Sequence, residues 1–527
     1  MKLKRCLEGI EIEFLRGDLN ADITGVTYDS RLVKRGFLFV ALKGCSQDGH
    51  DFIANAIENG ARAIVAERVG RLADHVFMPD NDAGHDNRAD LSVIKVRNSR
   101  KVLSAIAVNF YEYPFKDINL IGITGTNGKT TTSYLLESIL YHAGANPGVI
   151  GTINYRFAGR TVDATVTTPE SVDLIRILHE MSKAGVSDVV IEVSSHALDQ
   201  GRISACPIKV AVFTNLTRDH LDYHGSLENY FKAKTRLFTG EGQYHLSADA
   251  GCRSRRYPPV AVINMDDPWG KSLAALTYGS CVTYGLECSC DVRAEQIEQG
   301  PDGIRARLVT PYGTVLLESR LIGIFNVYNI LASAATAIAL GIDIETIAEG
   351  ISRLEGVPGR MQLIKNSQLL PVVVDYAHTP DALAKVIAAA REIVRGCLIT
   401  VFGCGGDRDM GKRQEMGYVA GKMSDVVVVT SDNPRTEDPA IIASQIVEGI
   451  RQSGMKELDQ PLTNESRGFF VDLNRSSAIR MAVNMADQTD LVLIAGKGHE
   501  TYQIIGNKKY PFDDRKEVLC ALEKGLQ

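Results

Sequence analysis

The sequence of 527 residues contains no apolar run long enough to span a membrane and no signal-peptide pattern. Its longest bland apolar stretch, residues 331–340, is well short of the roughly 18 residues that a membrane span needs. The first residues are basic, but Glu8, Glu11 and Glu13 stand where a signal peptide would have its apolar core. We therefore expect a cytoplasmic protein that does not insert into membranes.

The sequence also lacks a strong charge of either sign and a closely spaced cysteine set. Its formal net charge of −6 argues against a nucleic acid as the partner. The 10 cysteines are scattered, and the close pair Cys288 and Cys290 has no second pair or His-x-His motif to complete a zinc site. The cysteines are therefore predicted to be reduced, as is usual in the cytosol.

The chain is too long for a single hydrophobic core and predicts about three domains. We place them at residues 1–97, 98–354 and 355–527. In the second and third domains, near-continuous apolar runs alternate with helical patterns, which is typical of strands buried on both faces of a parallel sheet. The predicted class is α/β, with a central P-loop-type, mostly parallel sheet and a Rossmann-like C-terminal domain. Residues 79–90 and 240–259 are predicted to be loops.

A glycine-rich turn stands where a predicted strand, residues 119–123, gives way to a predicted helix, residues 131–140. Backbone N–H groups in such a turn can surround a phosphate, and the helix N-terminus adds positive potential. Lys129 would reach the outer phosphates, and the Thr130 hydroxyl would ligate Mg²⁺. The turn is shorter than a Walker A loop, because Ile123 stands where that loop has its first glycine. The predicted nucleotide-binding residues are Gly125, Thr126, Asn127, Gly128, Lys129, Thr130 and Thr131.

Two further polar residues follow predicted strands of the same domain. Glu192 is expected at the carboxyl end of its strand, where a carboxylate can hold Mg²⁺ because this cation prefers oxygen ligands. His220 follows the next strand, and it fits either a ligand of a second metal ion or a packed or solvated histidine.

Lys234 lies on the apolar side of a predicted helix over residues 226–238, whereas Lys232 points elsewhere. A lysine on a buried face must be paired, neutral or modified, unless its side chain reaches out to solvent. The apolar side of the helix is formed by Leu227, Tyr230, Phe231, Leu237 and Phe238.

Taken together, these residues resemble the Mur ligases, ATP-dependent enzymes that add amino acids to the peptidoglycan precursor. The resemblance covers nearly the whole chain, and it includes the runs 323–329, 357–360 and 375–378. It implies ATP and Mg²⁺ as cofactors, with Asn326, Arg360 and Asp375 on the adenine and ribose side of ATP. It implies catalytic roles for Lys129, Glu192, His220 and Lys234. It also implies a metal site of Thr130, Glu192, His220 and Lys234, with Lys234 carbamylated.

Within the family, the chain is similar to members that act on UDP-N-acetylmuramoyl-L-alanyl-D-glutamate and meso-diaminopimelate. Val166 departs from the pattern, because some relatives carry a polar asparagine there. Residues that match the uridine-nucleotide-binding domain are Ser30, Cys45, Ser46 and Gln47. Residues that match the contacts of the muramoyl dipeptide are Thr167, Thr168, Ser194, Gln200 and Arg202.

Three polar runs of the last domain each follow a predicted strand and should meet at one edge of the sheet. By resemblance they bind the incoming amino acid. Arg435 can bind the distal carboxylate that distinguishes meso-diaminopimelate from lysine, and Glu500 can pair with the neighbouring ammonium. Arg408 would hold the carboxylate beside the reacting amine. The other residues predicted for this site are Asp432, Asn433, Pro434 and Gly496.

The resemblance implies a reaction through an acyl phosphate. We expect the protein to be a monomer. One alternative is a lysine-adding ligase of the same family, against which Arg435 argues. A second is folylpolyglutamate synthetase, which should lack the run at residues 29–31. A third is a regulatory NTPase, which would have little use for the acceptor residues Arg435 and Glu500.

Overall fold

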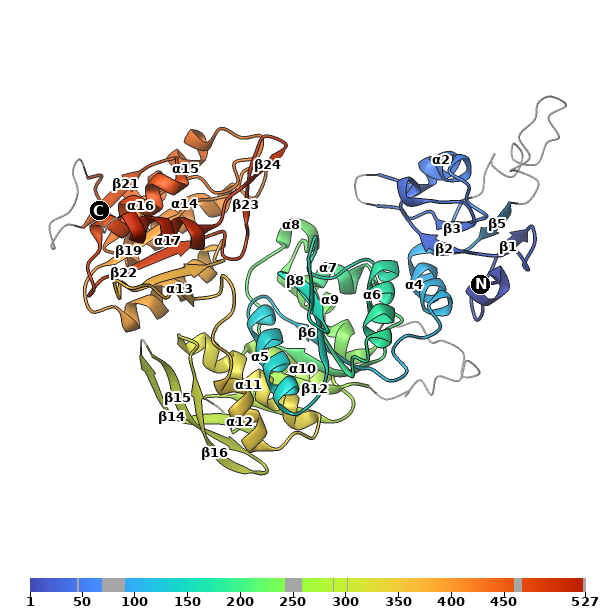
Figure 1. The fold of residues 1–527 in the computed structure, drawn as a ribbon, viewed down its shortest axis with the longest axis horizontal. Helices are drawn as coiled ribbons and strands as arrows, with labels where there is room; N and C mark the ends of the chain where they lie inside the picture. The colour runs from blue at the N-terminus through green and yellow to red at the C-terminus, as the bar shows by residue number, and fades with distance from the viewer. Residues whose placement is uncertain are drawn as a thin grey trace.

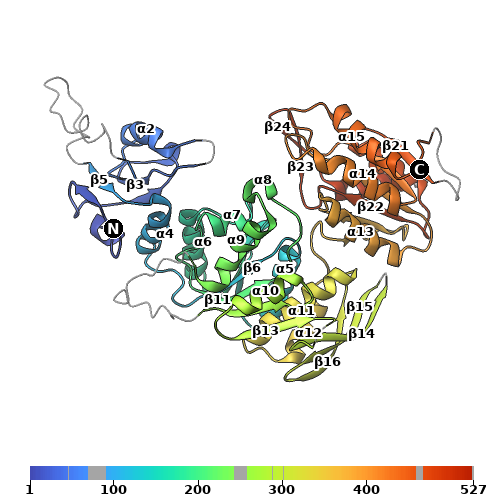
Figure 2. The same ribbon diagram turned by 180° about the vertical axis from the view of Figure 1, so that it is seen from behind.

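The computed structural model describes residues 1–44, 47–68, 91–241, 258–287, 289–300, 302–458 and 467–524. The predicted loop at 79–90, most of that at 240–259, and the site residues Cys45 and Ser46 lie outside this range. The described residues form three units that lie in an open arc, with the middle unit between the other two (Figures 1 and 2). None of the helices in these ranges is long and apolar enough to cross a membrane.

The N-terminal unit is a small sheet whose strands lie in the order β1-β5-β4-β3-β2, with β1 antiparallel to β5 and the other pairs parallel. One face packs on α2, and the other shares a core with α1 and α4. Helix α4 also packs against α6 of the middle unit. The elements are α1 (Leu3–Cys6), β1 (Phe14–Arg16), β2 (Gly25–Thr27), η1 (Ser30–Leu32), β3 (Phe37–Val40), η2 (Gly49–Phe52), α2 (Ile53–Glu58), β4 (Ala63–Ala66), β5 (Ser92–Lys95) and α4 (Ser99–Phe110).

The middle unit is built on an 11-stranded sheet in the order β16-β15-β14-β13-β12-β11-β6-β10-β7-β8-β9. Its centre is parallel, and antiparallel strands extend both edges. The strands are β6 (Asn119–Thr124), β7 (Pro147–Ile150), β8 (Asn154–Phe157), β9 (Arg160–Asp163), β10 (Asp188–Glu192), β11 (Ile208–Phe213), β12 (Val260–Asn264), β13 (Cys281–Gly285), β14 (Val292–Gly300), β15 (Gly303–Thr310) and β16 (Gly313–Ser319).

Alternate residues of the central strands enter cores on opposite faces, as the apolar runs predict for a sheet covered on both sides. In β10, Val189 and Ile191 face one core, whereas Val190 faces the other. Helices α5, α11 and α12 pack on the second face, and α6, α9 and α10 on the first. The helices are α5 (Lys129–His142), α6 (Ser171–Lys183), α7 (Ser195–Asp199), α8 (Leu221–His224), α9 (Leu227–Thr239), α10 (Pro268–Leu276), α11 (Ile324–Ala339) and α12 (Ile344–Ser352).

The C-terminal unit has a sheet in the order β17-β18-β22-β19-β20-β21, parallel except for β17. Helices α13, α14 and α15 pack on one face, and α16 and α17 on the other. The elements are β17 (Gln362–Leu363), β18 (Val372–Asp375), α13 (Pro380–Ile393), β19 (Leu398–Phe402), α14 (Gly411–Met423), β20 (Val426–Val429), α15 (Pro439–Gln452), β21 (Gly468–Val471), α16 (Arg475–Met485), β22 (Leu491–Ala495), β23 (Tyr502–Ile505), β24 (Lys508–Pro511) and α17 (Asp514–Lys524).

The predicted α/β class is confirmed, with parallel sheets in all three units. The domain boundaries at residues 97 and 354 stay predictions. Both larger sheets present the carboxyl ends of their parallel strands at one edge, which is where ligands bind in open α/β sheets.

Candidate active site

The glycine-rich turn connects the end of β6 at Thr124 to the start of α5 at Lys129. Gly125 and Gly128 have φ angles of +148° and +89°, a backbone conformation that residues other than glycine rarely adopt. A Cβ atom at Gly128 would also collide with Oδ1 of Asn329. Both glycines are therefore required by the path of the turn.

Lys129 folds back over this turn. Its Nζ donates hydrogen bonds to the carbonyl oxygens of Gly125, at 2.8 Å, and Thr126, at 2.9 Å. Burial lowers the pKa of Lys129 below its usual value. The amino group thus lies directly beside the loop amides that the sequence predicts to bind phosphate.

Glu192 ends β10 and is only 1% exposed. Its Oε2 accepts hydrogen bonds from the hydroxyls of Thr130, at 2.9 Å, and Thr152, at 2.8 Å, while its Oε1 accepts one from the backbone N–H of Thr152, at 3.0 Å. The carboxylate is therefore fixed beside the hydroxyl that the sequence assigns to Mg²⁺.

Lys234 is only 1% exposed, whereas Lys232 is exposed, as the pattern of α9 predicts. Among the described residues, the only hydrogen-bond acceptor of Lys234 Nζ is the carbonyl of Gly125, at 3.0 Å. Burial, and secondarily the positive charge of Lys129, holds the pKa of Lys234 well below its usual value. The buried amino group therefore lies beside the glycine-rich turn, in a setting that disfavours its charged form.

His220 caps the start of α8 and adopts a left-handed backbone conformation, with φ of 52°. Its ring packs edge-on against that of His196, with centroids 4.9 Å apart, and its Nε2 lies 3.3 Å from Oδ2 of Asp219. Partial burial lowers the pKa of His220 to about 4. The imidazole is thus neutral at pH 7 and retains a lone pair for a ligand.

The residues predicted to contact the dipeptide form one connected group. Arg202 donates to the carbonyl of Thr168, at 2.8 Å, and to Oε1 of Gln200, at 2.7 Å. The hydroxyl of Thr168 accepts from the N–H of Ser194 at 3.0 Å, and that of Thr167 lies 3.2 Å from the Thr152 hydroxyl.

The N-terminal unit carries the described residues predicted for uridine. The carbonyl of Ser30 accepts a hydrogen bond from Asn59, and the carbonyl of Gln47 accepts one from the N–H of Gly44. Tyr28 of this unit donates to Asp173 of α6 at 3.2 Å, which ties the unit to the middle sheet.

Arg360 reaches from the C-terminal unit to the glycine-rich turn. Its Nη2 lies 3.4 Å from the Thr130 hydroxyl, and its guanidinium stacks 4.5 Å from the ring centroid of Tyr376. Asp375, which burial gives a raised pKa, accepts hydrogen bonds from the N–H groups of Met361 and Ala377. Asn326 of α11 donates to the carbonyl of Ile322, just before the helix, and accepts from Asn329 within it.

The three polar runs of the C-terminal unit lie together at the carboxyl edge of its sheet. Asn433 donates to Oε2 of Glu500 at 2.9 Å, and Arg435 donates to the carbonyl of Gly406 at 2.7 Å. The left-handed backbone of Arg435, with φ of 51°, is held on both sides: its N–H donates to Ile504 and its carbonyl accepts from Gly506. Arg408 is exposed and donates to the carbonyl of Asp407. Pro434 and Gly496 are the backbone neighbours of this group.

Sequence reasoning missed three residues of these sites. Thr152 holds both oxygens of Glu192, Asn329 borders Gly128, and Lys497 is fully buried among the acceptor residues. Lys497 stands between two predicted site residues, Gly496 and Glu500, so its position was a usable signal. Asn329 ends the run 323–329 that carries the family resemblance, so the sequence singled it out without giving it a role. Thr152 is 40 positions from its partner Glu192 and gave no local signal.

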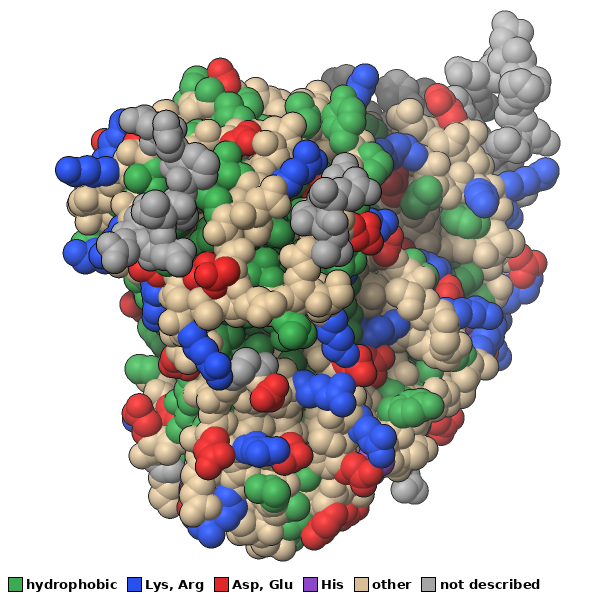
Figure 3. Space-filling view, turned by 60° about the vertical axis from the view of Figure 1, so that its left-hand side comes forward, with side chains coloured by type: hydrophobic (Ala, Val, Ile, Leu, Met, Phe, Trp, Pro, Cys, Tyr) green, Lys and Arg blue, Asp and Glu red, His purple; other side chains and the backbone are tan. Residues whose placement is uncertain are grey.

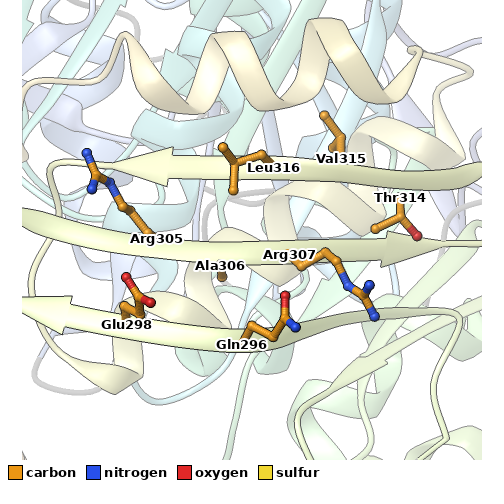
Figure 4. Close-up of a pocket in the computed structure, with 8 residues that line it drawn as sticks. All are labelled: Gln296, Glu298, Arg305, Ala306, Arg307, Thr314, Val315 and Leu316. Carbon is orange, nitrogen blue, oxygen red and sulfur yellow. The ribbon is translucent and has the colours of Figure 1, made fainter.

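A shallow hollow of about 320 Å³ on the outer face of β14–β16 lies apart from these sites (Figure 4). Its charged side chains pair with neighbours on adjacent strands, Arg305 with Glu318 at 3.1 Å and Arg307 with Glu295. Lys, Arg, Asp and Glu side chains are also intermixed over the face of the molecule shown in Figure 3. The hollow is therefore the solvated face of an antiparallel sheet.

Comparison with known proteins assigns the family. Three family models match in chain order: the Mur ligase family catalytic domain over residues 22–111, the Mur ligase middle domain over 123–337, and the Mur ligase glutamate ligase domain over 359–498. The chain belongs to the Mur ligase family. The matched regions contain the glycine-rich turn, Glu192, Lys234 and most of the acceptor residues.

Two Mur ligases with sequences similar to this chain have the same name. The UDP-N-acetylmuramoyl-L-alanyl-D-glutamate–2,6-diaminopimelate ligase of Geobacter metallireducens is 47% identical over 96% of both chains, and that of Geobacter sulfurreducens is 45% identical over 99% of this chain and 98% of its own. A solved structure of a ligase with this name has a TM-score of 0.67 and 32% identity, covering 100% of this chain and 99% of its own.

Proposed function

We propose that this Mur ligase joins meso-diaminopimelate to UDP-N-acetylmuramoyl-L-alanyl-D-glutamate at the expense of ATP, in peptidoglycan synthesis. The observation that carries the proposal is the acceptor cluster, in which Arg435, Asn433 and Glu500 meet at the carboxyl edge of the C-terminal sheet. A guanidinium beside a carboxylate suits an amino acid whose far end carries both a carboxylate and an ammonium. The names of the similar ligases support the same substrates.

Different substrates bind to different regions of the chain. Residues 1–97 bind the uridine nucleotide through Ser30 and Gln47. Residues 98–354 bind ATP at the glycine-rich turn and the dipeptide around Arg202. Residues 355–527 bind the amino acid, and we expect the enzyme to act as a monomer in the cytoplasm.

The reaction must activate a carboxylate that is a poor electrophile. The terminal D-glutamate carboxylate attacks the γ-phosphorus of ATP, which forms an acyl phosphate and releases ADP. The free amine of meso-diaminopimelate then attacks the acyl carbon, and inorganic phosphate leaves as the amide forms. Lys129 and the loop amides stabilise charge on the transferring phosphoryl group, so the chain mainly positions and neutralises its substrates.

The residues at the glycine-rich turn fit Mg²⁺. Thr130 and Glu192 present oxygen atoms, which this hard cation prefers, and His220 can add a nitrogen. Bound Mg²⁺ would neutralise negative charge on the phosphates of ATP. Among the described residues, no group of three or more His, Cys, Asp and Glu side chains is placed to hold a metal ion, so the remaining oxygen ligands would come from the ATP phosphates, water and a further anionic side-chain ligand.

Lys234 supplies that ligand once it is carbamylated. Burial lowers the pKa of Lys234 and so favours the neutral amine, the form that adds to CO2 and loses a proton to give a carbamate. The modification exchanges a buried amine that has no carboxylate partner among the described residues for an anion with two oxygen atoms that can act as ligands. It therefore accounts for a lysine on the apolar side of α9.

A ligation assay tests the proposed function. The purified enzyme is given ATP, Mg²⁺ and the UDP-linked dipeptide, with meso-diaminopimelate or lysine in parallel, and the products are identified by mass. We expect the tripeptide with diaminopimelate, and multiple-turnover ADP release only when both co-substrates are present. Preferential formation of the lysine product, or multiple-turnover ADP release without the acceptor, would contradict the proposal.

A further inference from the structure

Lys497 is a fully buried lysine at the centre of the acceptor cluster. It follows β22 and Gly496, on the carboxyl edge of the sheet. Its Nζ lies 3.1 Å from Oδ1 of Asn433, 3.1 Å from Oε2 of Glu500 and 3.4 Å from Oδ1 of Asp432. An ammonium group has three N–H donors, so these three acceptors use its full hydrogen-bonding capacity.

The contacts of Lys497 fix one oxygen of Glu500 and leave the other free. Lys497 and Asn433 both donate to Oε2 of Glu500, and no group among the described residues donates to Oε1. Asn433 is fixed in turn, because its Oδ1 also accepts from the N–H of Ile504 at 2.9 Å. One carboxylate oxygen is thus held by the protein while the second is available for a ligand.

The charges that contact Lys497 also favour a cationic ligand. Asp432 and Glu500 carry two negative charges around the single positive charge of Lys497, whereas Arg435 of the same cluster bonds to the carbonyl of Gly406 and is assigned to the distal carboxylate of the amino acid. The nearby Arg475 does not supply the missing charge, because it forms its own buried ion pair with Asp514 at 2.7 Å. A partly desolvated excess of negative charge is stabilised by a further cation.

We propose that Lys497 is a positioning residue for acceptor specificity: it holds Glu500 and Asn433 so that the free Oε1 of Glu500 receives the distal ammonium of the amino acid. This inference rests on the proposed function. Without Lys497, Asp432 and Glu500 would face each other with no cation between them, and Glu500 would lose its fixed orientation. The loss should fall on substrates that carry the distal ammonium.

The test compares two acceptors that differ by that one group. Meso-diaminopimelate has the distal ammonium, whereas 2-aminopimelate keeps the distal carboxylate and the reactive amine but lacks it. Both are assayed with the parent enzyme, Lys497→Met and the milder Lys497→Gln. For Lys497→Met, we expect kcat/KM for diaminopimelate to fall about 30-fold or more, mainly through a higher KM. The fold decrease in kcat/KM for 2-aminopimelate should be at least about ten times smaller than the fold decrease for diaminopimelate.

The controls separate positioning from a general loss of structure. Lys385→Met makes the same change on the exposed side of α13 in the same domain and should leave both acceptors unaffected. If the Lys497 variants lose activity on both acceptors by the same factor, or retain the parent KM for diaminopimelate, the inference is wrong. Lys497→Gln keeps this comparison available if Lys497→Met does not fold. A parent enzyme that fails to ligate diaminopimelate would instead contradict the proposed function itself.

Discussion

The Nζ atom of Lys234 lies 3.0 Å from the carbonyl oxygen of Gly125, the first glycine of the glycine-rich turn. A lysine on α9 is thus in direct contact with the loop that is predicted to bind ATP. The amino groups of Lys234 and Lys129 both donate to the carbonyl oxygen of Gly125. A modification of Lys234 is therefore expected to alter the surroundings of the ATP phosphates.

We predict that Lys234→Ala is nearly inactive and is partly rescued by a short carboxylic acid, which can replace the carbamate as an anionic ligand. Lys232→Ala, two residues away on the exposed side of α9, is the matched control and should be fully active. Carbon NMR of enzyme prepared with labelled bicarbonate should show a carbamate signal that Lys234→Ala lacks. A fully active parent enzyme without this signal would contradict the prediction.

Lys129→Ala should abolish turnover, because the substitution removes a charge that follows the transferring phosphoryl group. The loss should be roughly a hundredfold or more in kcat. Steady-state ADP release measures it, with a thermal melt to show that the variant is folded. The exposed Lys183→Ala should behave as the parent does, and near-normal turnover of Lys129→Ala would overturn the phosphate assignment.

Arg435→Ala should weaken discrimination between meso-diaminopimelate and lysine. The distal carboxylate would be desolvated without a partner, at a cost on the order of 2–4 kcal/mol. The KM values for ATP and the UDP-linked dipeptide should change little. Arg451→Ala, on the exposed side of α15, is the control. If Arg435→Ala distinguishes the two acceptors as sharply as the parent does, Arg435 does not select the substrate.

Arg475→Met should destabilise the protein, because it leaves Asp514 as a buried charge without its partner. Breaking such a pair commonly costs about 3–5 kcal/mol, whereas replacing both partners by apolar residues costs much less. Urea unfolding should therefore show a large loss for Arg475→Met and a partial recovery for the double variant Arg475→Met/Asp514→Leu. Arg480→Met, exposed on the same helix α16, should have a small effect. Equal losses for the single and double variants would count against this account.

The parts of the fold that could be predicted are those with a local pattern. The strand, turn and helix around Lys129 follow from glycine spacing and apolar periodicity, and the burial of Lys234 follows from its place on the apolar side of α9. The order of the strands could not be predicted, since β10 lies between β6 and β7 although it comes later in the chain.

The candidate sites divide in the same way. Arg435 and Glu500 were predicted because each belongs to a run that follows a strand and matches the family pattern; without that resemblance, the run at 432–435 indicates only a turn with a solvated arginine. The hold of Thr152 on Glu192 joins residues 40 positions apart, and that of Lys497 on Asn433 joins residues 64 positions apart. Such contacts depend on the packing of whole sheets, so the sequence places Lys497 within the acceptor run at 496–500 but does not show which residues it contacts.

The backbone of Arg435 has a consequence for engineering a new amino-acid preference. Its N–H and carbonyl are both bonded to the β23 end of a hairpin some 70 residues further along the chain. A graft of the four-residue run at 432–435 alone would therefore carry the guanidinium without the hairpin that sets its direction. The run at 432–435 and the hairpin of β23 and β24 form one structural unit. We expect acceptor preference to transfer between related ligases only when both segments are exchanged together.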